Sequence, residues 1–165
     1  MKAHTIVVGL GNPVLSDDGV GITVARALAP RLAGTGVEVV ESSWGGMRFL
    51  DLLAGYDRAV LVDAIEWRHG PVGTVYCLTP EEAIPTVRAS GYHDISLGQA
   101  LALGATLGIQ LPRAVVVFAI EVADATTVRE GLSPAVAAAV PEVVQEVEDL
   151  LAEWGALEGG RLVRG

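Results

Sequence analysis

The stretch TIVVGLGNP, residues 5–13, decides the fold, because an apolar run too short for a helix ends in a glycine-rich turn. Thr5–Gly9 is predicted to be a strand buried on both faces. Gly9–Asn12 then forms a tight turn, in which glycine lets the backbone approach a ligand closely. Gly19–Leu32 follows with apolar residues at helical spacing. The chain is therefore expected to open with a strand, a turn and a helix.

Short apolar runs and longer helical segments continue to alternate along the chain. Further strands are predicted at Val37–Glu41, Arg58–Asp63, Thr74–Leu78 and Arg113–Ile120, and further helices at Met47–Ala54, Leu97–Leu107 and Pro134–Trp154. Thr74–Leu78 follows the strand before it too closely for a right-handed crossover, so it is expected to be an antiparallel edge strand. The pattern predicts an α/β fold, a three-layer α/β/α sandwich around a mostly parallel five-stranded sheet. We expect a single domain over residues 1–157 and a loose tail at 158–165.

The composition narrows the class of partner. Of 165 residues, 51% are hydrophobic, and 20 acidic residues against 11 basic ones give a net charge of -9. Such a surface disfavours nucleic acid and anionic lipid, so we expect neither as a partner. No apolar stretch approaches the length of a membrane helix, and no signal peptide opens the chain, which predicts a cytoplasmic protein. The single cysteine, Cys77, is expected to be a small buried side chain and not a nucleophile.

Glycine-rich turns also bind phosphates, but this chain does not match either of the two common phosphate-binding motifs. A dinucleotide-binding fingerprint would need a glycine where Val14 stands, and a P-loop would need a lysine that this region lacks. A substrate groove is the functional alternative for this edge of the sheet. Its predicted lining comprises Gly11, Asn12, Gly45, Gly46 and Met47, although packing explains the last three equally well.

Two adjacent carboxylates, Asp17 and Asp18, stand at the mouth of the first predicted helix. One carboxylate suffices to cap a helix. Successive side chains diverge by about 100° at a helix start, so if Asp17 caps the helix, Asp18 points elsewhere. Asp18 is therefore the functional candidate, and Asp17 is expected to be a cap that the function can spare. Ser96 and Ser133 are likewise predicted to cap the third and fourth helices.

Asp63 and His93 complete the candidate set. Asp63 ends an apolar run, and burying an unpaired carboxylate is costly, so this side chain must reach a partner or the carboxyl edge of the sheet. His93 precedes the third predicted helix, whose dipole keeps the imidazole neutral, the form that ligates metal. If the first and third strands flank a reversal of strand order, Asp18, Asp63 and His93 converge at one crevice. Two carboxylates and an imidazole suit a divalent first-row ion, which promotes hydrolysis.

The ordered motifs resemble those of the hydrogenase maturation endopeptidases. They are the GLGN turn at residues 9–12, the DDGVG stretch at 17–21, LVDA at 61–64, His93 with Asp94, and GLSP at 131–134. The resemblance covers nearly the whole chain. It implies a protease that removes the C-terminal extension of a nickel-iron hydrogenase large-subunit precursor after nickel insertion. It also implies that Asp18, Asp63 and His93 contact the metal, which the precursor supplies, so the free enzyme is expected to be metal-free or to carry an adventitious divalent ion.

Three points stay open. Relatives often carry an aspartate and a Gly-Gly-Thr stretch where this chain has Glu41 to Trp44, which leaves the identity of the precursor undecided. A non-catalytic nickel-binding or large-subunit-binding chaperone would use the same three ligands. Peptidyl-tRNA hydrolases share the Gly-Leu-Gly-Asn-Pro turn, but they carry a catalytic histidine soon after it and bind RNA. No histidine occurs between His4 and His69, and the acidic charge argues against RNA.

Overall fold

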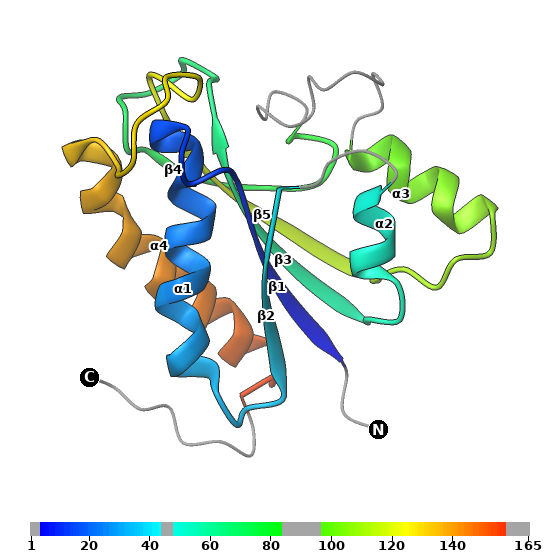
Figure 1. Ribbon diagram of the computed structural model, residues 1–165. Helices are drawn as coiled ribbons and strands as arrows, with labels where there is room; N and C mark the ends of the chain where they lie inside the picture. Colours follow the sequence, from blue (N-terminus) through cyan, green and yellow to red (C-terminus); the bar gives the residue numbers. More distant parts are fainter. Residues whose placement is uncertain (1–3, 44–47, 84–96, 158–165) are drawn as a thin grey trace.

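A computed structural model describes residues 4–43, 48–83 and 97–157. The five strands of its sheet lie in the order β2-β1-β3-β5-β4 (Figure 1). They are β1 (Thr5–Leu10), β2 (Val37–Ser42), β3 (Arg58–Ile65), β4 (Val75–Leu78) and β5 (Ala114–Glu121). All neighbouring strands are parallel except β4, which is an edge strand antiparallel to β5. The predicted fold class and the predicted antiparallel edge strand are therefore confirmed.

The strand order reverses between β1 and β3. The chain leaves β1 for β2 on one side and then returns to β3 on the other side of β1. From β3 it continues to the edge strand β4 and comes back to β5, which lies between β3 and β4. The connections that leave β1 and β3 thus diverge at the carboxyl ends of two adjacent strands. A crevice at such a reversal is where open α/β sheets bind ligands.

Helices cover both faces of the sheet (Figure 1). One face carries α1 (Val20–Leu32) and α4 (Pro134–Glu153), and the other carries α2 (Arg48–Leu53) and α3 (Leu97–Thr106). A 3-10 turn, η1 (Ser16–Gly19), precedes α1, so the first helical segment starts earlier and is wound more tightly than predicted. Ser96 and the predicted tail at 158–165 lie outside the described residues, and no helix within them is long and apolar enough to span a membrane.

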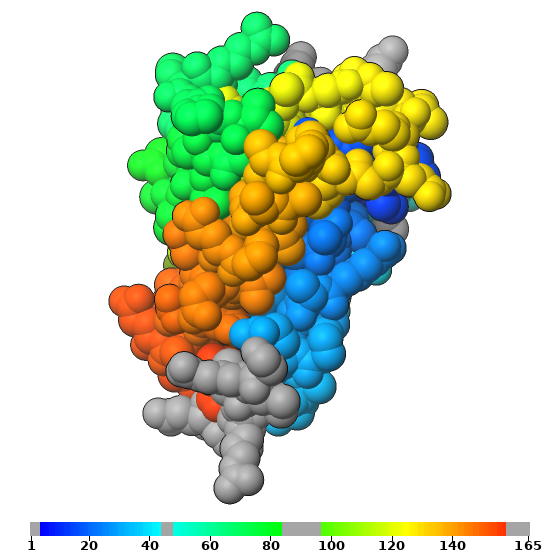
Figure 2. Space-filling model, turned by 90° about the vertical axis from the view of Figure 1, so that its left-hand side faces the viewer, coloured from blue at the N-terminus to red at the C-terminus, as the bar shows by residue number. Residues whose placement is uncertain are grey.

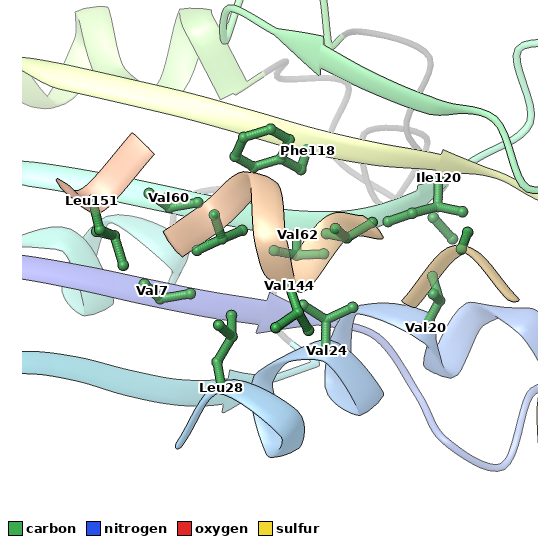
Figure 3. Packing of buried hydrophobic residues seen from close by; sticks show 14 of the residues in the cluster. Val7, Val20, Val24, Leu28, Val60, Val62, Phe118, Ile120, Val144 and Leu151 are labelled. Carbon is green, nitrogen blue, oxygen red and sulfur yellow. The ribbon is translucent and has the colours of Figure 1, made fainter. Parts of the chain in front are cut away.

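Alternation along the strands divides the core into two layers. On β3, Val60 and Val62 pack with α1 and α4, as Figure 3 shows, together with Val7, Leu28, Val144 and Leu151. Leu61 and Ile65 pack on the opposite side, against residues of α2 and α3. Because side chains alternate along a strand, Asp63 falls on the α2/α3 side. From Ala59 to Ile65, the side chains of β3 are buried on both faces of the sheet, as expected for a central strand.

Glycine brings the start of α1 directly onto the sheet. A Cβ atom on Gly21 would lie 2.2 Å from the carbonyl oxygen of Leu10 and 2.4 Å from that of Val62. Real Cβ atoms do not approach backbone oxygens so closely, so only glycine fits between α1 and the ends of β1 and β3. This contact fixes the start of α1 over the reversal of strand order.

An ion pair joins the parallel helices α1 and α4 in their C-terminal halves. Arg31 Nη2 donates to Glu148 Oε2 at 2.9 Å, and Arg31 Nε donates to Glu148 Oε1. Glu148 is only 4% exposed. The sequence predicts that Glu142, Glu146, Glu148 and Asp149 form a solvated face of this helix. This is wrong for Glu148, because its buried charge is paired by an arginine from another helix.

Candidate active site at the carboxyl edge of the sheet

Asp63 lies near the end of β3 and is 2% exposed. The parallel register pairs Gly9 with Val62, which puts Asp63 level with the last residue of β1. Its Oδ1 accepts the backbone N–H of Ala64 at 2.8 Å. The sequence predicted that this carboxylate reaches a partner or the carboxyl edge of the sheet, and the side chain does both.

Asp18 lies in η1 and is also 2% exposed. Its Oδ2 accepts the backbone N–H of Asn12 at 2.9 Å, which ties η1 back to the turn after β1. Gly11 makes this approach possible, because a Cβ atom there would lie 2.1 Å from the carbonyl oxygen of Asp18. The absence of a side chain at Gly11 therefore allows Asp18 to pack directly against the turn after β1.

Asp18 and Asp63 belong to the same edge of the sheet. η1 packs against β3, and the first turn of α1 rests on the ends of both β1 and β3. The other predicted groove residues, Gly11 and Asn12, lie at this edge, whereas Gly45, Gly46, Met47 and His93 lie outside the described residues. Among residues 4–43, 48–83 and 97–157, no three His, Cys, Asp or Glu side chains form a metal-binding group. The described part of the predicted site is thus the carboxylate pair Asp18 and Asp63.

Asp17 does not act as the sequence predicted. η1 and α1 have no side-chain cap hydrogen bond. Asp17 instead reaches the start of α4, where Oδ1 accepts the N–H of Ser133 at 2.7 Å and Oδ2 accepts its hydroxyl at 2.8 Å. Ser133 is the N-cap residue of α4, as predicted, but its hydroxyl binds Asp17 and makes no cap bond of its own. A carboxylate at this end of α4 is favoured by the helix dipole.

Glu121 is a buried carboxylate at this edge that the sequence analysis did not single out. It ends β5, is 2% exposed, and is in register with Ile65 of β3. Its carboxylate accepts the backbone N–H of Trp67 at 2.9 Å and that of Arg68, so it holds the segment that follows β3. The sequence signal was the same as for Asp63, an acidic residue closing an apolar run.

Cys77 was predicted to be buried, and this is wrong. It is exposed on β4, because an edge strand turns alternate side chains away from the core. Partial desolvation raises the pKa of the Cys77 thiol, and the charges of Glu146 and Glu82 raise it further. A thiol with a raised pKa is protonated at neutral pH and is a poor nucleophile. Its exclusion as a nucleophile therefore stands, for an electrostatic reason in place of burial.

The fold and the carboxylate pair define a class of α/β proteins with a polar site at the reversal of strand order. The hydrogenase maturation protease family matches residues 22–150, a stretch that contains Asp63 and begins just after Asp18. The chain therefore belongs to the hydrogenase maturation protease family, and its activity is that of a peptidase.

Individual relatives are similar to this chain in sequence or in fold over nearly its whole length. The Hydrogenase 2 maturation protease of Escherichia coli is 28% identical over 153 residues, which cover 91% of this chain and 92% of the relative. The solved structure of the hydrogenase maturating endopeptidase HybD from E. coli superposes with a TM-score of 0.77 at 25% identity, covering 92% of this chain and 93% of that one. A [NiFe] hydrogenase maturation protease from Thermococcus kodakarensis, at 24% identity, shares the fold with a TM-score of 0.67 over 88% and 97% of the two chains.

Proposed function

We propose that this endopeptidase removes the C-terminal extension of a nickel-iron hydrogenase large-subunit precursor after nickel has been inserted. The observation that carries the proposal is that two carboxylates are buried at this edge of the sheet, Asp18 in η1, which follows β1, and Asp63 near the end of the adjacent strand β3. The names of the relatives support the substrate class, since they are maturation proteases of hydrogenases. We expect processing to take place in the cytoplasm, which stays a prediction from the sequence.

The nickel of the precursor is part of the substrate in this proposal. Asp18, Asp63 and His93 would contact it, and two carboxylates with one imidazole form a donor set that suits a divalent first-row ion. Both carboxylates sit on rigid elements, a strand and a 3-10 turn held by glycine contacts, so they are preorganised to receive a metal brought in by another protein. Recognition of the metal would make processing wait for its insertion.

Hydrolysis at this site needs an activated water and a polarised peptide carbonyl. A divalent ion supplies either effect, and a neighbouring carboxylate can accept the proton of the water. The water oxygen then bonds to the carbonyl carbon, the C–N bond breaks, and a proton passes to the leaving amine.

We propose that Gly11 and Asn12 form one wall of the substrate groove, together with Gly45, Gly46 and Met47.

The direct test compares a purified large-subunit precursor in nickel-loaded and nickel-free forms. Incubation of each with this protein, followed by mass spectrometry, is expected to show loss of the C-terminal peptide from the loaded form alone. A nickel-binding chaperone would leave both masses unchanged while still binding the precursor. Cleavage of both forms at equal rates would show a protease that does not recognise the metal.

His93→Ala tests the third proposed ligand. Removing the imidazole is expected to weaken nickel-dependent binding of the precursor by about tenfold or more, because loss of a residue that merely supports a metal ligand already has an effect of this size. His4→Ala provides a control, since His4 is an exposed histidine just before β1. Binding of the nickel-loaded precursor to both variants with wild-type affinity would remove His93 from the site.

A further inference from the structure

Hydrogen bonds join the segment that carries Asp18 to the segment that precedes α4. Ser16 N–H donates to the carbonyl of Arg129 at 2.8 Å, and Arg129 N–H donates to the carbonyl of Val14 at 3.0 Å. Arg129 Nη2 also donates to Ser16 Oγ at 3.0 Å. Figure 2 shows α1 (blue) and α4 (orange) side by side, with the yellow segment before α4 at the end where both helices begin. Residues more than 110 positions apart are thus joined beside the candidate site.

Asp17 and Ser133 make the strongest of these links. Both oxygens of the Asp17 carboxylate are used, one by the N–H and one by the O–H of Ser133. Asp17 is 2% exposed, so these are charge-assisted hydrogen bonds shielded from water. Hydrogen bonds to a buried charge are worth more than neutral ones and hold their geometry more strictly.

The backbone at this link is held in an unfavourable conformation. Ser16 has a φ of 55°, in the left-handed region that a residue with a side chain rarely adopts. Such a conformation persists where surrounding contacts over-determine it. Here the contacts are the bonds of Ser16 to Arg129 and those of the next residue, Asp17, to Ser133. These bonds set the direction in which the chain enters η1.

We propose that Asp17 and Ser133 form a positioning pair for Asp18, an inference that rests on the proposed function. Asp17 precedes Asp18 in the same 3-10 turn, so anchoring one side chain to α4 fixes the rotation of the turn and the direction of the other. The pair thereby sets the Asp18 carboxylate against Asn12 and toward the edge shared with Asp63. This reverses the expectation from the sequence that Asp17 is dispensable.

A purely structural role is the alternative, in which the pair only joins α1 to α4. The Arg31–Glu148 ion pair provides the matched comparison, because it joins the same two helices away from the site. Arg31 lies eleven residues after Val20, which is about 16 Å along α1. Loss of that ion pair is expected to destabilise the protein without moving Asp18.

The experiment uses the variants Asp17→Ala, Ser133→Ala, Ser133→Thr and Glu148→Gln in the full chain. Cleavage of the nickel-loaded precursor gives kcat and KM. Amide hydrogen exchange at Asn12, followed by NMR, reports the bond to Asp18 without any substrate. Thermal unfolding gives the loss of stability for each variant.

We expect Asp17→Ala and Ser133→Ala to lower kcat by about tenfold or more, since small misplacements of catalytic groups have effects of this size. KM should change less than kcat. Exchange at Asn12 should accelerate in both variants beyond what the fall in global stability explains. Ser133→Thr keeps the hydroxyl and should restore kcat. Glu148→Gln should lower the melting temperature while kcat and the excess exchange at Asn12 stay at wild-type values.

The proposal is overturned if Asp17→Ala and Ser133→Ala behave as Glu148→Gln does, with lower stability but unchanged kcat and unchanged local exchange at Asn12. Failure of the proposed function looks different, because the wild-type protein would then not cleave the precursor at all. In that case the exchange at Asn12 still decides whether Asp17 and Ser133 position Asp18.

Discussion

Asp63→Asn is expected to abolish processing of the nickel-loaded precursor, with a fall in rate of about a hundredfold or more. The amide keeps the size of the carboxylate and an oxygen that can accept the N–H of Ala64, but it removes the negative charge at the end of β3. Stability should change by about 1 kcal/mol or less, because the same hydrogen bond can form and a buried charge disappears. Mass spectrometry of the precursor and urea denaturation of the variant measure the two effects.

Asp149→Asn is the matched control for this experiment. Asp149 is exposed on α4, where its Oδ1 accepts a hydrogen bond from Gln145, and it lies far along that helix from the candidate site. The same change of charge at this position is expected to leave processing at the wild-type rate. If Asp63→Asn processed the precursor as fast as Asp149→Asn, Asp63 would have no part in the reaction.

Gly21→Ala is expected to have the largest effect on the fold. The added methyl group would meet two backbone carbonyl oxygens, those of Leu10 and Val62, at 2.2 and 2.4 Å. Neither strand end can move without disturbing the centre of the sheet, so α1 must shift outward. Alanine gains about 1 kcal/mol of helix propensity, but overpacking in a rigid core costs about 1–3 kcal/mol or more. The clash is with backbone on two strands, so we expect a net loss of about 2 kcal/mol or more, together with loss of processing.

Gly98→Ala is the control for Gly21→Ala, because it makes the same change in helix propensity without the steric clash. Gly98 is the second residue of α3, as Gly21 is of α1. The nearest atom to a Cβ there is the side-chain Cγ of Glu81, at an ordinary 3.4 Å. Urea denaturation should show Gly98→Ala as neutral or slightly stabilising. Equal stability of the two variants would mean that α1 does not need the close approach at Gly21.

The secondary structure was largely predictable because its signals are local. The predicted strand boundaries agree with the observed ones to within one or two residues. Apolar runs of this length, bounded by turn residues, indicate buried strands, and a short link before β4 excludes a parallel crossover. The neighbour of β4 was not predictable, because its pairing with β5 depends on contacts between distant parts of the chain.

The acidic residues show that local sequence patterns do not suffice to predict the partners of buried carboxylates. Asp63 and Glu121 each close an apolar run and each is buried, yet only Asp63 was selected. The difference between them lies in their partners, since Glu121 accepts two N–H groups from the segment after β3. Asp17 and Glu148 were assigned to a cap and to solvent, but their partners, Ser133 and Arg31, lie 116 and 117 residues away. No pattern within a window of sequence contains such pairs.

The amino-acid sequence by itself determined the α/β class, the order of its elements, and the places of Asp18 after the first strand and of Asp63 at the close of the third apolar run, whereas the adjacency of these two strands came from the structure. Hydrophobic period and glycine placement suffice for the class, the order and these places, because they act over a few residues. Only the tertiary structure decided which carboxylate binds which group, that η1 is anchored to α4, and that α1 rests on the ends of β1 and β3. Burial of a charge is tolerated only where partners converge on it, and convergence is a property of the folded chain.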